Sequence, residues 1–580
     1  MSGAVNFATS PVLELKLPVW RSRLLAVVIF SGFAVLAGRA VYLQGLHNDF
    51  LQAKGESRYG RIIEINATRG RITDRHGEIL AVSTPVKSIW AIPDEVRLEQ
   101  PQLARLAALL EMPPQEIRRR IDETGRDFIF IKRQIPPQVA DRVAEMRIPG
   151  LFQNREYRRY YPGGEVMAHV LGFTGAEDAG QEGVELAFQH HLAGKPGSRR
   201  VIRDRLGQIV EDVEGIRAAQ EGKDLSLALD AKIQSLAFAQ LKAAVDQHRA
   251  KAGSIVVLDI LTGEVLALAS LPTYNPNNRA RLSGAQLRNR AVTDTFEPGS
   301  TLKPFTIAVA LESGRLTPQS TIQTAPGTLT IGTATIRDAH PEGMLTVEQI
   351  IQKSSNVGAA KIALSLPAES MWNLFRSVGF GATPRLGFPG EANGRVRPYR
   401  SWRPIEQATM AYGHGISVSL LQLAHAYSVF ARDGEMIPLS LMRLDAPRTP
   451  QVVISAQTAQ RVRHMLELAV QPRGTAPRAQ IMGYRVAGKT GTAHKQENGS
   501  YAANKYVSSF VGFAPASGPR LVIAVMIDEP SNGQYYGGAV AAPVFARVME
   551  GALRLMSVPP DAPMNPIELP AEGQEVKESI

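Results

Sequence analysis

A serine and a lysine lie three residues apart in the stretch FEPGSTLKPF, residues 296–305. If this stretch begins a helix, Ser300 and Lys303 share one helix face, because residues i and i+3 are neighbours there. The positive helix end and partial burial would lower the pKa of Lys303. A neutral amine can then accept the proton of the serine hydroxyl. The pair predicts a serine nucleophile with a lysine as its base.

The same stretch also has a plainer interpretation, as an ordinary helix start. Serine is a favoured N-cap residue, and Pro304 would cost little in the first helical turn. Lys303 fits this interpretation less well, because a cation in the first turn faces the positive end of the helix dipole. S-x-x-K also arises by chance in a chain of ordinary composition and this length, so the pair alone leaves both interpretations open.

Two further short motifs follow in the chain, S-x-N within QKSSNVG and K-T-G within VAGKTGTA. S-x-N alone is a weak signal. K-T-G is stronger because it lies in a segment typical of a strand, where glycine lets another backbone or a ligand approach closely, although a strand bend would also explain it. The three motifs in this order indicate a single site. The residues that they add are Ser354, Ser355, Asn356, Lys489, Thr490, Gly491 and Thr492.

The segments around the motifs predict an α+β domain at residues 221–555. An amphipathic helix follows its start, and GSIVVLDILTGEVLALAS (253–270) predicts two strands joined by a turn at Thr262-Gly263. VAGKTGTA, KYVSSFVGFAPA and RLVIAVMIDEP predict three more strands near the other end, with helices between. Strands at both ends predict a sheet assembled from distant segments.

An apolar stretch near the N-terminus predicts one membrane-spanning helix at residues 24–46. The span must extend past Arg39 to reach the roughly 20 residues that cross a hydrocarbon core. Basic residues precede it, which marks residues 1–23 as a short cytoplasmic tail. A cleaved signal peptide and a buried core helix are the alternatives. AGRA is a poor cleavage site, and Trp20 and Tyr42 flank the stretch as aromatic residues do at membrane interfaces.

Between this anchor and the α+β domain, residues 47–220 predict a domain of short strands and helices. RGRITDRHGEILAVS (69–83) predicts a strand, a turn at His76-Gly77 and a second strand. No group of residues with catalytic chemistry is apparent here, so a structural domain is favoured. Residues 556–580 are rich in Pro and Glu with few large apolar residues, which predicts a disordered tail.

The composition narrows the possible chemistry. The chain contains no cysteine, which excludes thiol catalysis, disulfides and thiolate metal sites, and neither a metal-ligand set nor a cofactor is expected. The net charge is +11, but the 65 basic residues are scattered among 54 acidic ones. A solvated basic surface is therefore favoured over a nucleic-acid site.

With S-x-x-K, S-x-N and K-T-G in this order, the sequence resembles the serine penicillin-binding protein and β-lactamase superfamily. The resemblance extends to AGSIVVLDILTGEVLALASLPTYNPN, NRAVTDTFEPGSTLKPFTIAVAL and YGHGISVSLLQLAHAYSVFARDG. RGRITDRHGEILAVS and RYYPGGEVMAHVLGF resemble the non-catalytic module of class B enzymes, and the nearest type is the division-specific septal one. The implied fold is an antiparallel sheet with helices on both faces and an all-helical lobe, on an elongated α/β pedestal of the class B dimerisation type.

The resemblance implies a peptidoglycan D,D-transpeptidase that cross-links stem peptides through an acyl-enzyme on Ser300, works at the division septum and is a target of β-lactams. Lys303 would accept the Ser300 proton, and Ser354 would relay it to the leaving D-Ala. Asn356 would bind the substrate amide and hold Lys303. Backbone N–H groups of Ser300 and Thr492 would form the oxyanion hole. The substrate carboxylate would be bound along the strand of Lys489, Thr490, Gly491 and Thr492.

The resemblance also bears on a nearby loop, on partners and on location. Tyr535 and Tyr536 lie in a loop that borders the site in this family, although packing explains them equally well. His414 lies in a family motif and is assigned no catalytic role. The implied partners are stem peptides ending in D-Ala-D-Ala, β-lactams, a SEDS-type glycosyltransferase and other divisome membrane proteins. The implied location is the bacterial inner membrane, with a single span and the catalytic domain in the periplasm.

Related activities remain as alternatives. A class A β-lactamase needs a glutamate in E-x-x-x-N, which ESMWN (369–373) matches, but this stretch has the pattern of an amphipathic helix. A membrane-anchored D,D-carboxypeptidase would differ only in admitting water. Intact motifs count against a silent divisome scaffold. Residues 50–220 do not resemble the glycosyltransferase domain of a bifunctional class A enzyme.

Overall fold

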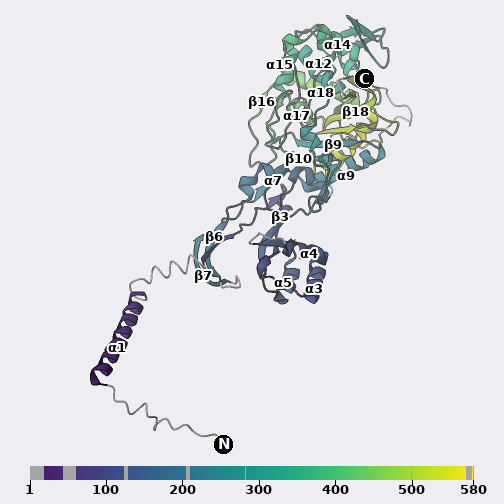
Figure 1. Ribbon diagram of the computed structural model, residues 1–580. Coiled ribbons are helices and arrows are strands. Elements are labelled where there is room, and N and C mark those ends of the chain that lie inside the picture. The colour runs from purple at the N-terminus through teal and green to yellow at the C-terminus, as the bar shows by residue number, and fades with distance from the viewer. Residues whose placement is uncertain are drawn as a thin grey trace.

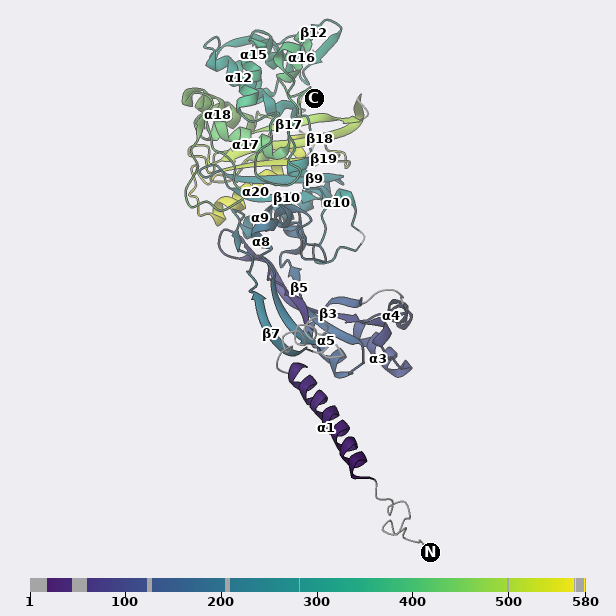
Figure 2. The ribbon, with the colours of Figure 1, turned by 60° about the vertical axis from the view of Figure 1, so that its left-hand side comes forward.

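The computed structural model describes residues 18–43, 60–122, 128–203, 209–280, 282–497, 500–567, 569 and 578. Three parts follow one another along the chain: an N-terminal helix, an elongated pedestal and a larger C-terminal domain (Figure 1). Figure 2 shows the pedestal strands running toward the C-terminal domain, with the small helices α3, α4 and α5 to one side.

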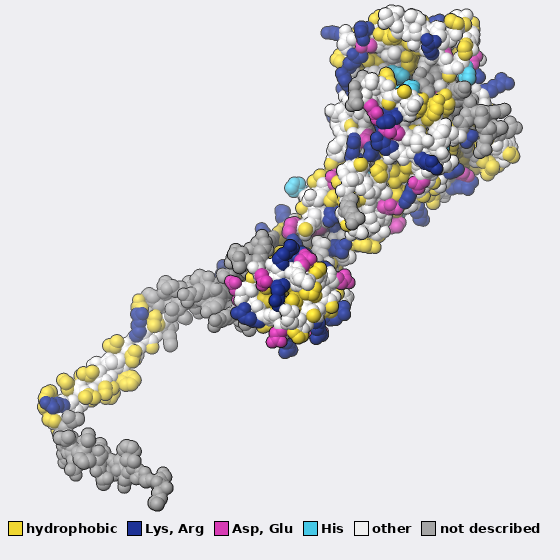
Figure 3. Space-filling view, turned by 45° about the vertical axis from the view of Figure 1, so that its right-hand side comes forward, with side chains coloured by type: hydrophobic (Ala, Val, Ile, Leu, Met, Phe, Trp, Pro, Cys, Tyr) yellow, Lys and Arg dark blue, Asp and Glu magenta, His cyan; other side chains and the backbone are white. Residues whose placement is uncertain are grey.

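The N-terminal helix α1 (Val19–Val41) is the one described helix that is long and apolar enough to cross a membrane, with a mean hydropathy of 2.2. None of its residues is buried, and Figure 3 shows hydrophobic side chains along it with basic side chains at both ends. Arg39 lies over the ring of Tyr42, 5.3 Å from its centroid. The helix begins before the predicted span of 24–46, and residues 44–46 lie outside the described residues.

The pedestal contains two antiparallel-rich sheets. In one, the strand order is β4-β3-β2-β8, and β5 also pairs with β3; in the other, β6 lies between β1 and β7. The predicted turn at His76-Gly77 joins β2 to β3. Helices α3 (Gln100–Leu110), α4 (Pro114–Ile121) and α5 (Pro137–Glu145) enclose a separate aliphatic core against β3 and β4. The strands are β1 (Gly60–Ile65), β2 (Ile72–Thr73), β3 (Ile79–Ala91), β4 (Ile129–Ile135), β5 (Leu151–Tyr160), β6 (Gly197–Arg203), β7 (Ile209–Arg217) and β8 (Leu225–Ser226).

A five-stranded antiparallel sheet forms the centre of the C-terminal domain, in the order β10-β9-β19-β18-β17. The predicted hairpin is confirmed: β9 and β10 pair, and Gly263 takes a φ of +76° in the turn between them. Every residue of β9, β10 and β19 is buried, so both faces of the sheet are covered there. The strands are β9 (Ala252–Asp259), β10 (Val265–Leu271), β17 (Ala487–Glu497), β18 (Ser500–Ala514) and β19 (Leu521–Asp528).

Helices cover both faces of this sheet. On one face, α9 (Ala231–Gln247) and α20 (Ala542–Leu555) pack through an aliphatic and aromatic core. The other face packs against a helical lobe, in which α17 and α18 lie nearest the sheet. The predicted architecture is therefore confirmed. The lobe helices are α12 (Lys303–Glu312), α13 (Val347–Lys353), α14 (Asn356–Leu364), α15 (Ala368–Ser377), α16 (Pro404–Met410), α17 (Leu420–Ala431) and α18 (Ala456–Val470).

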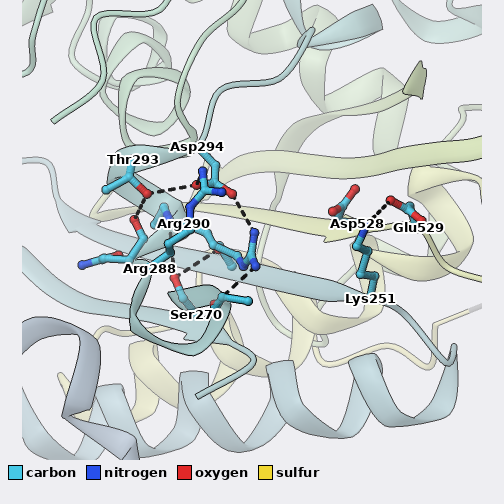
Figure 4. Close-up of polar contacts among 12 residues, drawn as sticks. Lys251, Ser270, Arg288, Arg290, Thr293, Asp294, Asp528 and Glu529 are labelled. Carbon is cyan, nitrogen blue, oxygen red and sulfur yellow. Dashed lines mark hydrogen bonds and ion pairs between the residues drawn. The ribbon is translucent and has the colours of Figure 1, made fainter. Parts of the chain in front are cut away.

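A compact polar turn fixes the chain just before FEPGSTLKPF. Asp294 accepts hydrogen bonds from Arg288 at 2.5 Å, Arg290 at 2.7 Å and Thr293 at 2.9 Å (Figure 4). These contacts close the short helix α11 (Arg290–Thr293), which packs against β9 and β10. The chain thus leaves the sheet in a defined direction before it reaches the serine.

The described part of the C-terminal stretch is packed, which differs from the predicted disorder of residues 556–580. The Tyr484 hydroxyl donates to the Val558 carbonyl at 2.6 Å. Asp561 accepts from the Arg485 N–H at 2.7 Å and from the Ser517 hydroxyl at 2.6 Å. These hydrogen bonds hold the stretch against the catalytic domain, although it contains few large apolar residues. Residues 568, 570–577, 579 and 580 lie outside the described residues.

Candidate active site

Ser300 lies within a short 3-10 helix, η6 (Gly299–Leu302), that continues into α12. It does not cap this helix: Pro298 is the N-cap residue, and no side chain makes a capping hydrogen bond. Instead, Lys303 Nζ donates a 2.8 Å hydrogen bond to Ser300 Oγ. Pro304 lies in the first turn of α12, as predicted. The hydroxyl therefore interacts with the lysine, and the simple capping interpretation is wrong.

Lys303 is fully buried, and its pKa is far below the usual value for lysine. Burial is the main cause, and the charge of Lys489 lowers the pKa further. The charges of Asp338 and Glu578 oppose this shift. The predicted burial is thus the main cause of the lowered pKa, and the second lysine adds to it. A neutral amine at Lys303 can act as a base toward Ser300.

Ser354 connects the two lysines. It ends α13 in the left-handed conformation, with a φ of +61°, which is uncommon for a residue other than glycine. Its carbonyl accepts from Lys303 Nζ at 2.6 Å, and its hydroxyl lies 3.0 Å from Lys303 Nζ and 3.0 Å from Lys489 Nζ. A hydroxyl can both donate and accept a hydrogen bond, so Ser354 can pass on a proton that it receives from a neighbouring lysine.

Asn356 begins α14, and Asp338 fixes this helix start. One oxygen of Asp338 accepts from the N–H groups of Asn356 at 2.5 Å and Val357 at 3.0 Å, and the other accepts from the Ser355 hydroxyl at 2.6 Å. Asn356 Nδ2 donates to the Arg337 carbonyl at 3.3 Å, whereas its buried Oδ1 has no hydrogen-bond partner in the described part of the chain. The expected contact between Asn356 and Lys303 is absent from the hydrogen bonds of the described residues, because Ser354 occupies the lysine amine.

The K-T-G motif lies on β17, the edge strand of the central sheet. Lys489 Nζ lies 3.3 Å from Thr490 Oγ1 and 3.5 Å from Thr475 Oγ1, and the two threonine hydroxyls are 3.1 Å apart. Burial lowers the pKa of Lys489 to about 8, and the carboxylate of Glu578 partly opposes that shift. Lys489 thus remains mostly cationic at neutral pH and faces the same serine hydroxyl as Lys303.

Gly491 allows β17 to pack against the turn that carries Ser300. A Cβ atom at this position would lie 2.7 Å from the Pro298 carbonyl oxygen and 2.6 Å from Ser509 Oγ. The predicted close approach of another backbone is thus observed. Thr492, one residue further, projects its hydroxyl toward Gly537, whose N–H donates to it at 2.9 Å. The turn and the strand therefore form two sides of one site.

Comparisons with known proteins agree with this geometry. The penicillin binding protein transpeptidase domain matches residues 253–550, and the penicillin-binding protein dimerisation domain matches residues 64–227. The chain is 44% identical over 537 residues to a probable peptidoglycan D,D-transpeptidase, PenA, of Neisseria gonorrhoeae, covering 92% of each. The chain belongs to the class B penicillin-binding proteins.

Two further proteins are similar to this chain, one over nearly its whole length and one over its C-terminal domain. The peptidoglycan D,D-transpeptidase FtsI of Escherichia coli K12 is 40% identical over 549 residues, which cover 94% of this chain and 93% of the relative. The solved apo transpeptidase domain of Burkholderia pseudomallei penicillin-binding protein 3 is 47% identical, with a TM-score of 0.54, over 58% of this chain and 98% of that one. This penicillin-binding protein is a serine-type peptidoglycan D,D-transpeptidase, as the resemblance implied. The boundary at residues 220 and 221 stays a prediction.

Three more residues singled out from the sequence, Tyr535, Tyr536 and His414, make ring contacts in this penicillin-binding protein. Tyr535 stacks on Tyr506 with centroids 4.1 Å apart, and Tyr536 lies 4.6 Å from Tyr535, directly before the Gly537 that contacts Thr492. His414 packs at 5.1 Å from the Tyr412 ring, and burial and the charge of Lys303 lower its pKa to about 4.

The glutamate of the β-lactamase-like E-x-x-x-N match lies elsewhere. Glu369 is exposed in the first turn of the amphipathic helix α15, as expected for a residue outside the site. Among the described residues, no group of three or more His, Asp or Glu could hold a metal ion.

Sequence reasoning missed several residues that shape the site. Asp338 follows a short strand and carries no motif, and Thr475 lies in a loop before the K-T-G strand. Glu578 comes from the stretch predicted to be disordered, yet it is buried and accepts from Thr492 Oγ1 at 2.8 Å and from the Gly538 N–H at 2.9 Å. Only contacts between distant segments reveal these roles.

Proposed function

We propose that Ser300 is the nucleophile of this transpeptidase and Lys303 its base. The observation that carries this proposal is the 2.8 Å hydrogen bond between the buried Lys303 amine and the Ser300 hydroxyl. Neutral Lys303 takes the Ser300 proton while Oγ attacks the carbonyl carbon of the penultimate D-Ala of a stem peptide. The N–H groups of Ser300 and Thr492 stabilise the oxyanion that forms.

Ser300, Lys303 and Ser354 complete the acylation and then serve the transfer step in reverse. The amide bond breaks, and the terminal D-Ala leaves with the proton that Lys303 passes through the Ser354 hydroxyl. The amine of a second stem peptide then attacks the ester, which forms the cross-link and returns a proton to Ser300. The unpartnered Oδ1 of Asn356 suits the N–H of the substrate amide.

The K-T-G strand supplies the binding site for the substrate carboxylate. Lys489 gives a buried positive charge, and Thr490 and Thr492 give hydroxyl donors on the same strand. Tyr535 and Tyr536 form a wall beside the strand. A penicillin also carries a carboxylate beside a reactive amide, so it would occupy the same groups and acylate Ser300.

The protein is proposed to act at the division septum from the bacterial inner membrane. Arg21 and Arg23 at the start of α1 favour a cytoplasmic N-terminus, which supports a periplasmic location for the pedestal and the catalytic domain. Stem peptides ending in D-Ala-D-Ala are its substrates. Glycan polymerisation would come from a SEDS-type glycosyltransferase, with other divisome membrane proteins as partners. Depletion in cells should cause filamentation, whereas normal division would contradict the septal role.

A fluorescent penicillin tests the nucleophile directly. We expect it to label the wild type and not Ser300→Ala. Ser313→Ala, at the exposed far end of α12, should be labelled like the wild type and serves as the matched control. Lys303→Ala should abolish labelling while the melting temperature changes little. Labelling of Ser300→Ala would contradict the nucleophile assignment, and unfolding of Lys303→Ala would make that lysine structural.

A further inference from the structure

The carboxylate of Glu578 lies inside the transpeptidase site. The residue is 2% exposed, and its two oxygens accept from Thr492 Oγ1 at 2.8 Å and from the Gly538 N–H at 2.9 Å. Burial raises the pKa of Glu578, whereas the charge of Lys489 and the hydroxyls of Thr492 and Thr490 oppose this shift and favour the ionised form. Glu578 thus has a hydrogen-bond donor at each of its two oxygens and the charge of Lys489 nearby, as expected for a bound carboxylate.

Thr492, Thr490 and Lys489 are also the groups that the proposed function assigns to the substrate carboxylate. Thr492 has one hydroxyl proton, and Glu578 Oε2 already accepts it. The Gly537 N–H in turn donates to the hydroxyl oxygen of Thr492. A second carboxylate therefore cannot bind while Glu578 is in place. The described contacts of Glu578 are made by its side-chain carboxylate, which therefore acts as an occupant of the site rather than as a substrate.

The occupant also affects the base. The charge of Glu578 raises the pKa of Lys303 and that of Lys489 relative to an empty site. Lys303 is then more often protonated and a weaker base toward Ser300. Blocking of the carboxylate site and partial protonation of the base act in the same direction, so both make the occupied site less reactive.

Glu578 belongs to the same chain, which strengthens its binding. The chain is anchored to the catalytic domain at Asp561 by Arg485 and Ser517, and Glu578 follows 17 residues later (578 − 561). A ligand on a short tether of this kind experiences an effective concentration of about a millimolar. At that effective concentration, contacts with a dissociation constant below about a millimolar keep the carboxylate bound in more than half of the molecules.

We propose that Glu578 is an internal competitive inhibitor of the transpeptidase site. This inference rests on the proposed function, because the inhibited site is the site that binds the substrate carboxylate. Stem peptides and penicillins must displace the Glu578 carboxylate before Ser300 can be acylated. Glu578 thereby sets the fraction of molecules that are open to substrate.

The rate of penicillin acylation in the full-length protein tests this inference. Glu578→Gln keeps the shape of the side chain but removes its charge, and we expect its second-order labelling rate to rise about tenfold, as loss of one charge-assisted contact allows. Glu575→Gln removes a charge three residues away in the same segment and should stay within about twofold of the wild type. An unchanged or slower rate for Glu578→Gln overturns the inhibitor.

A peptide experiment gives an independent readout. A synthetic peptide of residues 571–580 should slow labelling of Glu578→Gln competitively with penicillin, and the same peptide with Gln at position 578 should not. Equal effects of the two peptides, or none from either, contradict recognition of this carboxylate. Failure of the wild type and of Glu578→Gln alike to label at Ser300 would instead contradict the proposed function, so the two failures are distinguishable.

Discussion

Two buried lysines share one serine hydroxyl, and this sets the chemistry at the scale of residues. Lys303 Nζ and Lys489 Nζ each lie 3.0 Å from Ser354 Oγ. Two amines so close in a buried site disfavour being charged together. The pKa of Lys303 is the more strongly lowered, so Lys489 keeps the charge and Lys303 gives it up. One lysine is thus suited to accept a proton and the other to bind an anion.

The acylation rate should therefore depend on pH in two opposite ways. It rises as Lys303 loses its proton, at a pH well below the 10.5 of a free lysine, and it falls above about 8 as Lys489 loses the charge that binds the carboxylate. Penicillin acylation rates between pH 5 and 10 would show this bell shape. Lys489→Arg stays charged throughout and should lose only the falling limb. A rate that still climbs at pH 10 in the wild type contradicts this division of roles.

At the scale of elements, a turn between two helices aims the side chains of S-x-N. α13 ends at Ser354 in the left-handed conformation, and α14 begins two residues later. Asp338 holds that start through three hydrogen bonds, and its negative charge lies at the positive end of α14. Asp338 thus positions Ser354 and Asn356 without being in the proton path.

Asp338→Asn should slow penicillin acylation about 10- to 100-fold, since bonds to a charged group are worth roughly 1.5–3 kcal/mol. Its charge also raises the pKa of Lys303, so the rising limb of the pH profile should shift to lower pH. A purely structural role would leave that limb where it is. Glu342→Gln, in the same loop, is the matched control. Wild-type rates with Asp338→Asn would exclude the positioning role.

At the scale of the whole molecule, a buried ion cluster holds the pedestal together near the catalytic domain. Glu185 accepts from Arg69 Nε at 2.5 Å and from Arg159 Nε at 2.7 Å, and all three side chains are almost fully buried. Arg69 comes just before β2 and Arg159 lies on β5, so the cluster joins distant segments. β2 then pairs with β8, which leads into the catalytic domain.

Glu185→Gln should destabilise the pedestal by about 3–5 kcal/mol, because two buried arginines lose their counter-ion. Hydrogen exchange of β3 and β5 under mild urea would report this loss separately from the central sheet. Glu177→Gln removes an ion pair to Arg133 from a 79% exposed carboxylate and should cost no more than about 1 kcal/mol. Equal protection in the two variants would show that the cluster contributes little.

The sequence was sufficient for the features that depend on local order. The spacing of Ser300 and Lys303 places them on one helical turn, and Gly491 marks a close backbone approach on a strand. An apolar strand pattern predicted the β9–β10 hairpin, and a long apolar run predicted α1. Each follows from the geometry of a few consecutive residues, which a single sequence contains.

Only the tertiary structure determined which groups meet. Ser354 lies 51 residues from Lys303 and 135 from Lys489, yet one hydroxyl contacts both. Asp338 carries no motif, and Glu578 stands in a stretch whose composition predicts disorder. Their roles arise because folding buries lysine charges that then require nearby hydroxyls and carboxylates. Burial and charge pairing are properties of the packed molecule, so neighbouring residues in the chain do not reveal them.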